Sequence, residues 1–368
     1  MKYMMLKEVC SIKMGQSPAS DSYNDNGEGV PFFQGNADFG ERYPVARKWC
    51  SAPMKMAEPE DILISVRAPI GALNYAKEEC CIGRGLAALT PNKSKILPEY
   101  MFWLLKGKNA ELNSKGTGST FKAIGRKVLE EILVPDIGME QQMEYAANLE
   151  KINGIIQLRK QELQKLDELI KSRFVEMFGT VKENPYNFPT ATLKEVCHKI
   201  TDGKHGGCEQ EANSGYYYIG AREIYDGAIH YDTAPQITYA DFTKDYRRCN
   251  IEQGDMVIVN TGATIGKSAI AVSSLTERTL LQKSVALLKV KTDMVSAEFL
   301  RYCYMANPSM YMVKSASAQP NLLLSKMNAT VIYLPPRELQ EQFADFVAQT
   351  DKSKLTIQKS LDELETLN

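Results

Sequence analysis

The chain has 368 residues, of which 44% are hydrophobic and 24% charged, and its net charge is −1. This composition is typical of a folded protein of two or three domains, and the near-neutral charge argues against a free-standing, non-specific nucleic-acid binder, which is usually basic. No apolar run approaches the roughly 18 residues of a membrane span, and charges interrupt the N-terminus too early for a signal peptide. We therefore expect a cytoplasmic protein without a membrane partner, which meets any nucleic acid through local patches or together with a basic partner.

The eight cysteines include no CxxC pair, and Cys80 is directly followed by Cys81. This usage predicts reduced thiols rather than a disulfide frame. The densest group of metal-type side chains fits no zinc template and comprises Cys197, His198, His205 and Cys208. We accordingly predict no metal site.

The first half of the chain predicts short elements separated by turns. In chain order they are a leading segment at 6–10, an aromatic strand at 31–35, an acidic turn with a β-branched strand and a glycine loop at 59–71, a strand at 85–89, a short helix at 98–106 and a strand ending at Pro135. Turn signals such as Asn26-Gly27 fit short strands. We expect a mixed α+β domain at 1–137, not a doubly wound parallel sheet.

A long amphipathic helix is predicted next, at 138–180, and Gly179 with Asn184-Pro185 ends it. Its apolar residues recur every seven positions, which is typical of a coiled coil. About 40 residues span near 60 Å, too far for the face of one short domain to cover, so we expect this helix to pack on a second helix at 337–368. The predicted seam comprises Leu149, Ile152, Ile156, Leu163, Leu166 and Ile170 in the first helix, and Ile357, Leu361 and Leu364 in the second.

The second half repeats the plan of the first in unchanged order. Leu193–Cys197 is identical to Leu6–Cys10 at an offset of 187. The further matches are an aromatic strand at 216–220, a strand and glycine loop at 254–266, a strand at 284–288, a helix at 296–305, a strand ending in proline at Pro335 (an offset of 200 from Pro135) and a helix start at 339–343 that matches 139–143. We infer a duplication. The predicted fold is α+β, with two similar mixed domains at 1–137 and 181–336 and two long antiparallel helices at 138–180 and 337–368 that join and separate them.

Catalytic motifs are not recognisable. The segment 260–268, NTGATIGKS, resembles a phosphate-binding loop, but only three residues separate Gly262 from Gly266 where such a loop needs four. The matching loop at 67–73 has no Gly-Lys-Ser. We interpret both segments as tight loops at strand ends, presented to a ligand, and predict no catalytic residue.

The recurring loops carry side chains that suit base reading, because arginine pairs with guanine and asparagine or glutamine with adenine. Taken singly, each is more often a solvated or structural residue, but they recur at matching places and differ in type, as expected if each half reads a different sequence. The candidates are Gln34, Asn36, Arg67 and Arg84 in the first half and Arg222, Asn260, Thr261, Lys267, Gln282 and Lys283 in the second. Candidates for phosphate contacts are Lys122, Arg126, Gln319, Asn321 and Lys326.

An ordered set of segments resembles the specificity subunit of type I restriction-modification systems, and it covers essentially the whole chain. The segments are 6–9 (LKEV), 29–36 (GVPFFQGN), 61–71, 171–179 (KSRFVEMFG) and 334–342 (LPPRELQEQ). One departure is 134–138, which lacks the Pro-Pro pair of the second half.

The resemblance implies two target-recognition domains, each reading one half of a split, asymmetric target in double-stranded DNA. It implies that the helices set the gap and dock two methyltransferase subunits, which two ATP-driven restriction/translocase subunits can join. S-adenosylmethionine, ATP and magnesium then belong to the partner subunits, and this chain is non-catalytic without a cofactor of its own. Half-sites on one face of the duplex are expected about 34 Å apart.

Three alternatives remain at this point. One is a nucleotide-binding enzyme that uses the loop at 262–268. Another is a coiled-coil scaffold without DNA contact. The third, close to the main reading, is the recognition subunit of a related type II system that cuts on both sides of its site.

Overall fold

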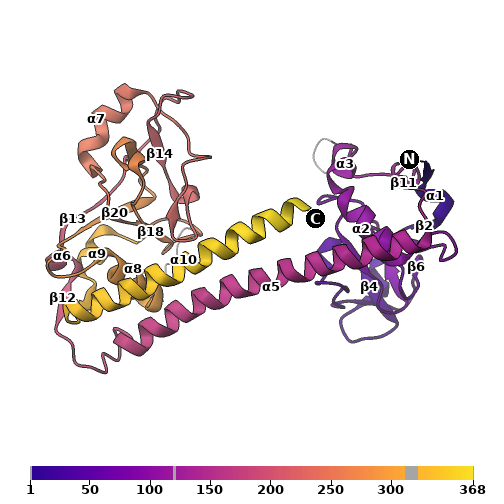
Figure 1. Cartoon of the computed structure of the whole chain (residues 1–368), viewed down its shortest axis with the longest axis horizontal. Helices are drawn as coiled ribbons and strands as arrows, with labels where there is room; N and C mark the ends of the chain where they lie inside the picture. Colours follow the sequence, from indigo (N-terminus) through magenta and orange to yellow (C-terminus); the bar gives the residue numbers. More distant parts are fainter. Residues whose placement is uncertain (1, 119–121, 311–321, 368) are drawn as a thin grey trace. The chain divides into compact units, whose positions relative to one another are not determined.

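The computed structural model describes residues 2–118, 122–310 and 322–367. The chain forms two compact units: unit 1 comprises residues 1–158 and 361–368, and unit 2 comprises residues 159–360. Each unit mixes short helices with small, mostly antiparallel sheets, and the two share one series of elements (Figure 1). The predicted mixed α+β repeat is therefore confirmed.

Unit 1 is built on two sheets. An antiparallel sheet has the order β2-β10-β7-β8, a second has the order β3-β5-β4-β9-β6, and β1 pairs with β11. The strands are β1 Tyr3–Met5, β2 Cys10–Met14, β3 Tyr23–Asn24, β4 Val30–Phe33, β5 Trp49–Cys50, β6 Met56–Ala57, β7 Ile62–Ser65, β8 Leu73–Tyr75, β9 Cys80–Ile82, β10 Leu86–Pro91 and β11 Leu133–Pro135. The short helices are α1 Leu6–Val9, α2 Pro98–Gly107, α3 Asn109–Ser114, α4 Arg126–Glu130 and the 3-10 turns η1 Ser20–Ser22 and η2 Asn36–Asp38.

Unit 2 repeats this arrangement with the antiparallel order β13-β20-β17-β18, while β12 pairs with β21 and β14 with β19. The strands are β12 Thr190–Thr192, β13 Cys197–Asp202, β14 Tyr217–Ile219, β15 Ile224–Tyr225, β16 Ala228–Ile229, β17 Met256–Val259, β18 Ser268–Ile270, β19 Thr279–Leu281, β20 Val285–Val290 and β21 Val331–Tyr333. The short helices are α6 Leu193–Val196, α7 Tyr239–Cys249, α8 Ala297–Ala306, α9 Leu324–Ala329 and the 3-10 turns η3 Ala221–Glu223, η4 Ser274–Arg278 and η5 Pro308–Met310. The long helices are α5 Met139–Phe178 and α10 Arg337–Leu367.

The repeated LKEV segment forms the same one-turn helix in both units for a local reason. In α1 the Glu8 carboxylate accepts a hydrogen bond from the backbone N–H of Met5, and in α6 Glu195 accepts one from Thr192. This contact satisfies an N–H that the helix itself leaves unpaired. The flanking leucine and valine of each copy are fully buried, so the segment also anchors each sheet to its core.

The offset of 200 between the two prolines is wrong for the strands that precede the long helices. Tyr3 pairs with Pro135 in unit 1, whereas Thr190 pairs with Tyr333 in unit 2, an offset of 198, and β21 ends at Tyr333. Aligning the two repeats by Pro135 and Pro335 gave the wrong offset, because proline is tolerated both at the end of an edge strand and just before a helix.

A buried glutamine at the start of each long helix gives the same corrected offset. Gln142 accepts a hydrogen bond from the N–H of Leu97 and donates to the Ile137 carbonyl. The Gln340 side chain accepts a hydrogen bond from the backbone N–H of Ser296 and donates one to the Pro335 carbonyl. The start of α5 therefore corresponds to that of α10 at an offset of 198, not 200.

Within unit 2, α10 lies alongside residues 159–178 of α5 in the antiparallel sense (Figure 1). The rings of Phe178 and Phe343 are 5.7 Å apart, and at the other end of this contact the Lys354 ammonium lies 2.7 Å from the Asp167 carboxylate. The order of these contacts reverses along the two helices. The antiparallel arrangement thus holds over this stretch.

The predicted seam residues are buried or half-buried, but they do not all serve a helix pair alone. Ile170 belongs to the core of unit 2 with residues of β17 and α8, and Leu149 packs against the core of unit 1. Each end of α5 thus also covers a globular core, in addition to the helix pairing that the sequence predicts. A coiled coil between the two helices stays a prediction.

Candidate nucleic-acid interface

Three loops of unit 1 meet where β4, β7 and β9 end. Because β4 and β9 are parallel neighbours, their C-terminal ends lie side by side. The Gly83 N–H donates to the Phe33 carbonyl (2.8 Å), and the Val66 N–H donates to the Gly85 carbonyl (2.8 Å). These bonds enclose a cavity of about 190 Å³, here called cup 1, that is lined by Gln34, Gly35, Asn36, Arg67, Ala68, Arg84 and Gly85.

The floor of cup 1 is backbone, because its loops approach too closely for side chains. A Cβ atom at Gly85 would lie 2.3 Å from the Gln34 carbonyl oxygen, and one at Gly83 would lie 3.0 Å from the Gln34 Cα. Glycine is the residue that permits such an approach. A ligand that enters the cup therefore meets peptide groups below and the polar side chains of the rim around it.

The rim of cup 1 is basic. The side chains of Gln34, Arg67 and Arg84 are exposed. The backbone N–H and Nε–H of Arg84 both face the Ser17 hydroxyl, at 3.3 and 3.4 Å. The carboxylate of Asp38 accepts hydrogen bonds from the backbone N–H groups of Gln34 and Gly35. The structure thus brings together the four base-reading candidates of the first half, although their role in DNA binding stays a prediction.

Unit 2 carries the counterpart of this loop cluster, built by the same backbone bonds. The Gln282 N–H donates to the Ile219 carbonyl (2.8 Å), and the Asn260 N–H donates to the Ser284 carbonyl (3.0 Å). These bonds place Asn260 at the position of Val66, Thr261 at that of Arg67 and Lys283 at that of Arg84. Arg222 lies in η3, the counterpart of the turn that begins at Asn36.

Two predicted base readers of the second half do not fit that role. Asn260 is only 4% exposed, as expected for the counterpart of the core residue Val66, and it accepts a hydrogen bond from the Thr261 hydroxyl. Gln282 turns back onto β14, where its side-chain amide donates to the Tyr218 carbonyl (3.3 Å) and its carboxamide covers Gly220. The sequence could not reveal this because both residue types also satisfy buried backbone. Arg222 and Lys283 are exposed, and Thr261 is half-buried.

Lys267 lines a cavity formed with the helices of unit 2. It is exposed, and this cavity of about 900 Å³ is also lined by residues of α5, α8 and α10 such as Arg301 and Lys354. The loop at 260–268 that ends here joins two strands, β17 and β18, which pair antiparallel. A phosphate-binding loop leads from a strand into a helix, so the hairpin does not favour nucleotide binding.

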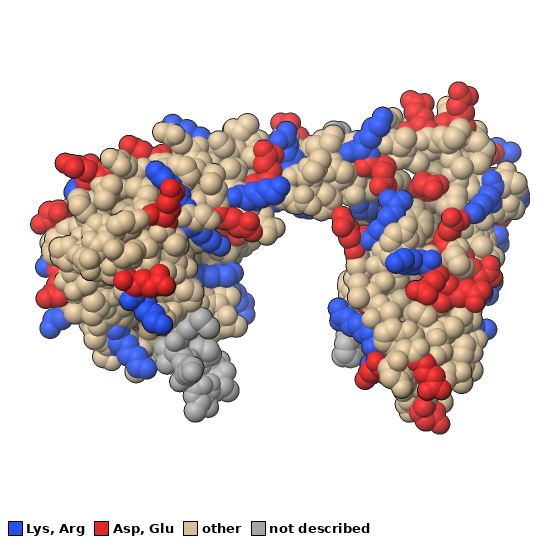
Figure 2. Space-filling model, turned by 90° about the horizontal axis from the view of Figure 1, so that it is seen from below, with Lys and Arg blue, Asp and Glu red and all other residues tan. Residues whose placement is uncertain are grey.

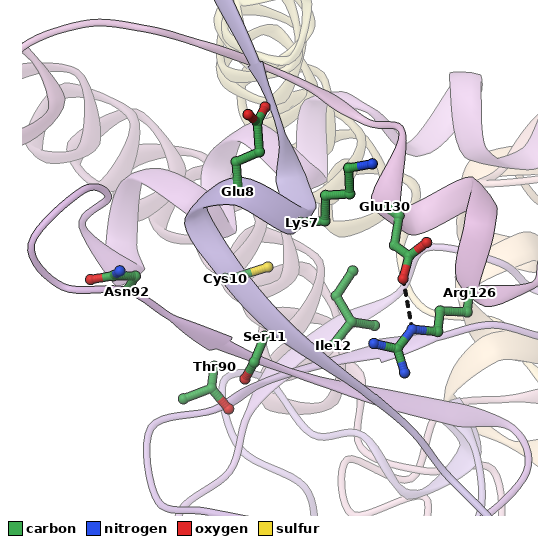
Figure 3. A pocket seen from close by; sticks show the side chains of 9 residues that line it. All are labelled: Lys7, Glu8, Cys10, Ser11, Ile12, Thr90, Asn92, Arg126 and Glu130. Carbon is green, nitrogen blue, oxygen red and sulfur yellow. Dashed lines mark hydrogen bonds and ion pairs between the residues drawn. The ribbon is translucent and has the colours of Figure 1, made fainter.

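The phosphate-contact candidates of unit 1 separate in space. The Lys122 carbonyl accepts the N–H of Ala68, which places residue 122 beside cup 1. Arg126 instead lines a cavity of about 510 Å³ with Cys10 and Thr90, at the opposite end of β2 and β10 (Figure 3). There its guanidinium pairs with Glu130 at 2.7 Å, so Arg126 does not join the cup. Gln319 and Asn321 lie outside the described residues.

The sequence interpretation missed a fourth loop in each cluster, the one that follows the strand after LKEV. The Gln16 N–H donates to the Ile82 carbonyl, and in unit 2 the Lys204 N–H donates to the Leu281 carbonyl. This loop brings Ser17 to cup 1 and His205 to its counterpart. The repeated glycines just before them, Gly15 and Gly203, were the available signal, since a Cβ at either would collide with backbone carbonyls.

In unit 2 this fourth loop is held by ion pairs to α7. Asp202 pairs with Arg248 of α7, and the Lys204 ammonium lies 2.8 Å from the carboxylate of Asp245, also on α7. Within the loop, the His205 ring is hydrogen-bonded to Asp202. Burial acts to raise the pKa of Asp202, but the hydrogen bonds from Arg248 and His205 outweigh it, so the pKa is lowered. Helix α7 thereby positions the loop that leads to the second loop cluster.

The lowered pKa of Asp202 predicts an acid-sensitive contribution to stability. A carboxyl whose pKa is lower in the folded than in the unfolded chain stabilises the fold above its unfolded pKa, near 4, and loses this contribution as the pH falls through the folded pKa. We expect Asp202→Asn to be less stable than the wild type at pH 6, and the difference to shrink as the pH falls below 4, measured by urea unfolding. A stability difference that stays constant over this range would contradict the assignment.

On the face shown in Figure 2, acidic and basic side chains are intermingled on the surface rather than segregated into large patches of one sign. This pattern matches the net charge of −1 and means that attraction for an anionic ligand has to be local, as at the rim of cup 1.

In the described parts of the chain, no group of three or more His, Cys, Asp or Glu side chains is placed to hold a metal ion. The eight cysteines are free, and burial raises the pKa of the thiols of Cys10, Cys80 and Cys197 to about 12. None of the described helices is both long enough and apolar enough to span a membrane.

Comparison with known proteins shows which family the chain resembles along its length. The family described as "Type I restriction modification DNA specificity domain" matches residues 1–168 and again residues 185–366. The putative type I restriction enzyme MjaX specificity subunit of Methanocaldococcus jannaschii is 43% identical over 160 residues, which span 44% of this chain and 38% of that relative. The MjaIX specificity subunit of the same organism is 21% identical over 97% of this chain and 88% of its own length.

A solved structure extends the likeness to the fold of the whole chain. The S subunit of a type I restriction-modification system from M. genitalium aligns over 100% of this chain and 93% of its own, with a TM-score of 0.54 and 14% identity. At that identity the match concerns the fold alone. Because the family match takes in nearly the whole length, once in each repeat, the chain belongs to the type I restriction modification DNA specificity family.

Proposed function

We propose that this chain is the DNA-recognition subunit of a type I restriction-modification complex, in which each unit reads one half of a bipartite, asymmetric target. The observation that carries the proposal is the pair of loop clusters, which the same backbone bonds build at equivalent positions while the exposed residues differ. Two half-sites of different sequence require the same backbone arrangement in both units, with different exposed side chains in each. The family membership supports DNA as the ligand.

In this proposal the two domains extend over residues 1–137 and 181–336, and the long helices 138–180 and 337–368 separate them and set the gap between the half-sites. The helices, paired as a coiled coil, also dock two methyltransferase subunits, and two restriction/translocase subunits can join the complex. Surface side chains on α5 support a docking role, since Ile155, Leu158 and Leu169 are 44%, 65% and 49% exposed.

The chain itself is proposed to be non-catalytic. S-adenosylmethionine, ATP and magnesium then bind to the partner subunits, which carry out base flipping and adenine methylation. Support comes from the hairpin geometry of the loop at 260–268, which is unlike a phosphate-binding loop. A recognition subunit of a type II system would share these features, and the subunits that co-purify with the chain distinguish the two.

Methylation-aware sequencing tests the proposal. We expect a host with the chain and its methyltransferase subunits to carry modified adenines in a two-part motif with a fixed gap, and a host that lacks the chain to have none there. A motif without a gap, or an unchanged motif after deletion, would contradict the proposal. So would tight, stoichiometric binding of ATP or S-adenosylmethionine by the isolated chain.

A further inference from the structure

We propose that Arg67 and Arg84 are the guanine-reading residues of unit 1, and that Thr261 and Lys283 occupy the same two positions in unit 2 and give it a different half-site. This inference rests on the proposed function, because it names the bases that cup 1 recognises.

The first support is the position of the two arginines in cup 1. Arg67 lies two residues after the end of β7, and its backbone forms a bridge with Ala123. Arg84 follows β9, and both its N–H and its Nε–H face the Ser17 hydroxyl. The Arg67 guanidinium thus starts from backbone that a β-bridge holds, and the Arg84 guanidinium starts from backbone that the Ser17 hydroxyl holds. Both arginines line cup 1 together with Gly35 and Gly85. Sites held by strands position side chains better than sites on free loops.

The second support is that the donors of these arginines remain available. Among the described residues, neither guanidinium has an ion pair with a carboxylate, in contrast to Arg126 with Glu130 or Arg248 with Asp202. The Ser17 contact takes only the Nε–H of Arg84, so the terminal nitrogens keep the fork of donors that matches two acceptors at once. Guanine presents such a pair, O6 and N7, in the major groove.

The third support is the comparison between the repeats. If both positions contacted only phosphate, a basic residue would serve equally well in either unit, because phosphates are the same in every sequence. Instead, Arg67 is replaced by the uncharged Thr261, and Arg84 by Lys283, which has no planar fork. Gln34 and Asn36 complete the rim of cup 1 with side chains that suit adenine.

The test uses the full-length chain assembled with its methyltransferase subunits and a set of DNA duplexes. Each duplex changes one base pair of the target that sequencing defines. For Arg84→Ala we expect discrimination at a single G·C pair to fall by about 5- to 150-fold, with the other positions unchanged. Arg67→Ala is expected to do the same at another G·C pair in the same half-site.

Matched variants make the outcome decisive. Arg126→Ala removes the same residue type from the same unit at the other end of the sheet, and it should leave discrimination unchanged. Lys283→Ala should alter positions only in the other half-site. Arg84→Lys keeps the charge without the fork, so it should retain general DNA affinity while it loses discrimination.

Three results would overturn the inference. The first is an equal loss of affinity for all duplexes together with a weaker salt dependence, which is the result expected for a phosphate contact. The second is an unchanged discrimination profile of the arginine variants. The third is that Arg84→Ala and Lys283→Ala change discrimination in the same half-site. In each of these the wild-type complex still recognises a bipartite target, so the proposed function stands. A wild-type complex without a bipartite target would instead refute the proposed function.

Discussion

Phe174→Ala is expected to lower the free energy of unfolding of unit 2 by about 3–5 kcal/mol, the range for removal of a fully buried phenylalanine. Phe174 lies on α5 with an exposed fraction of 0%. Its ring centroid is 4.9 Å from that of Phe178, 5.5 Å from that of Phe299 on α8 and 5.3 Å from that of Phe343 on α10. Its loss leaves a cavity where the two long helices meet the globular core.

The neighbouring residue provides the control. Val175 is 43% exposed on the same turn of α5, so Val175→Ala should change stability by less than about 1 kcal/mol. Chemical denaturation of the full chain, followed by circular dichroism, measures both variants. Equal effects of the two substitutions would show that α5 does not pack on unit 2 as described.

Gln340→Leu is expected to destabilise unit 2 by at least about 2 kcal/mol, because each buried polar group left without a partner costs about 1–3 kcal/mol. Gln340 is 1% exposed. It accepts the N–H of Ser296 and donates to the carbonyls of Met294 and Pro335. Leucine has a similar size but leaves all three groups unpaired.

The same change in unit 1, Gln142→Leu, removes the corresponding bonds to Leu97, Lys95 and Ile137 and should have a comparable effect. Gln342→Leu is the control, since Gln342 is exposed on the same helix as Gln340. Thermal unfolding of the four proteins, wild type included, gives the comparison. If the substitution of the exposed Gln342 lowered the melting temperature as much as the substitution of the buried Gln340, the hydrogen bonds at the helix starts would not anchor the helices.

Much of the fold was predictable because the repeat occurs in the sequence itself. LKEV at 6–9 and 193–196, the apolar strands at 62–65 and 256–259 and the long helix to Phe178 all appear where the pattern indicates. These features are local: hydrophobic periodicity, a capping glutamate and a terminating glycine act between residues close in sequence. The last two matches, the prolines and the helix starts, failed by two residues, because proline fits both of the positions at which it occurs.

The candidate site was predictable only in part. Glycine loops after strands correctly indicated that Gln34, Asn36, Arg67 and Arg84 come together, because strand ends in one sheet lie at one edge. The same argument placed Asn260 and Gln282 in the second loop cluster but did not indicate that their side chains bond within the protein. Arg126, predicted as a phosphate contact from a late polar segment, lies at the other end of the sheet and pairs with Glu130. Exposure of a polar side chain depends on which distant backbone groups need a partner, and a sequence pattern contains no information on that.

The sequence by itself thus determined that one mixed α+β plan occurs twice with a long helix after each copy, since composition, periodicity and identity between the halves are properties of the chain. The tertiary structure alone decided which polar residues are exposed at the loop clusters. Parallel pairing of β4 with β9 and of β14 with β19 brings loops some 50 to 60 residues apart within hydrogen-bond distance. In the folded chain Arg67 and Arg84 line one cavity, Gln282 bonds to the Tyr218 carbonyl, and Arg126 forms an ion pair with Glu130.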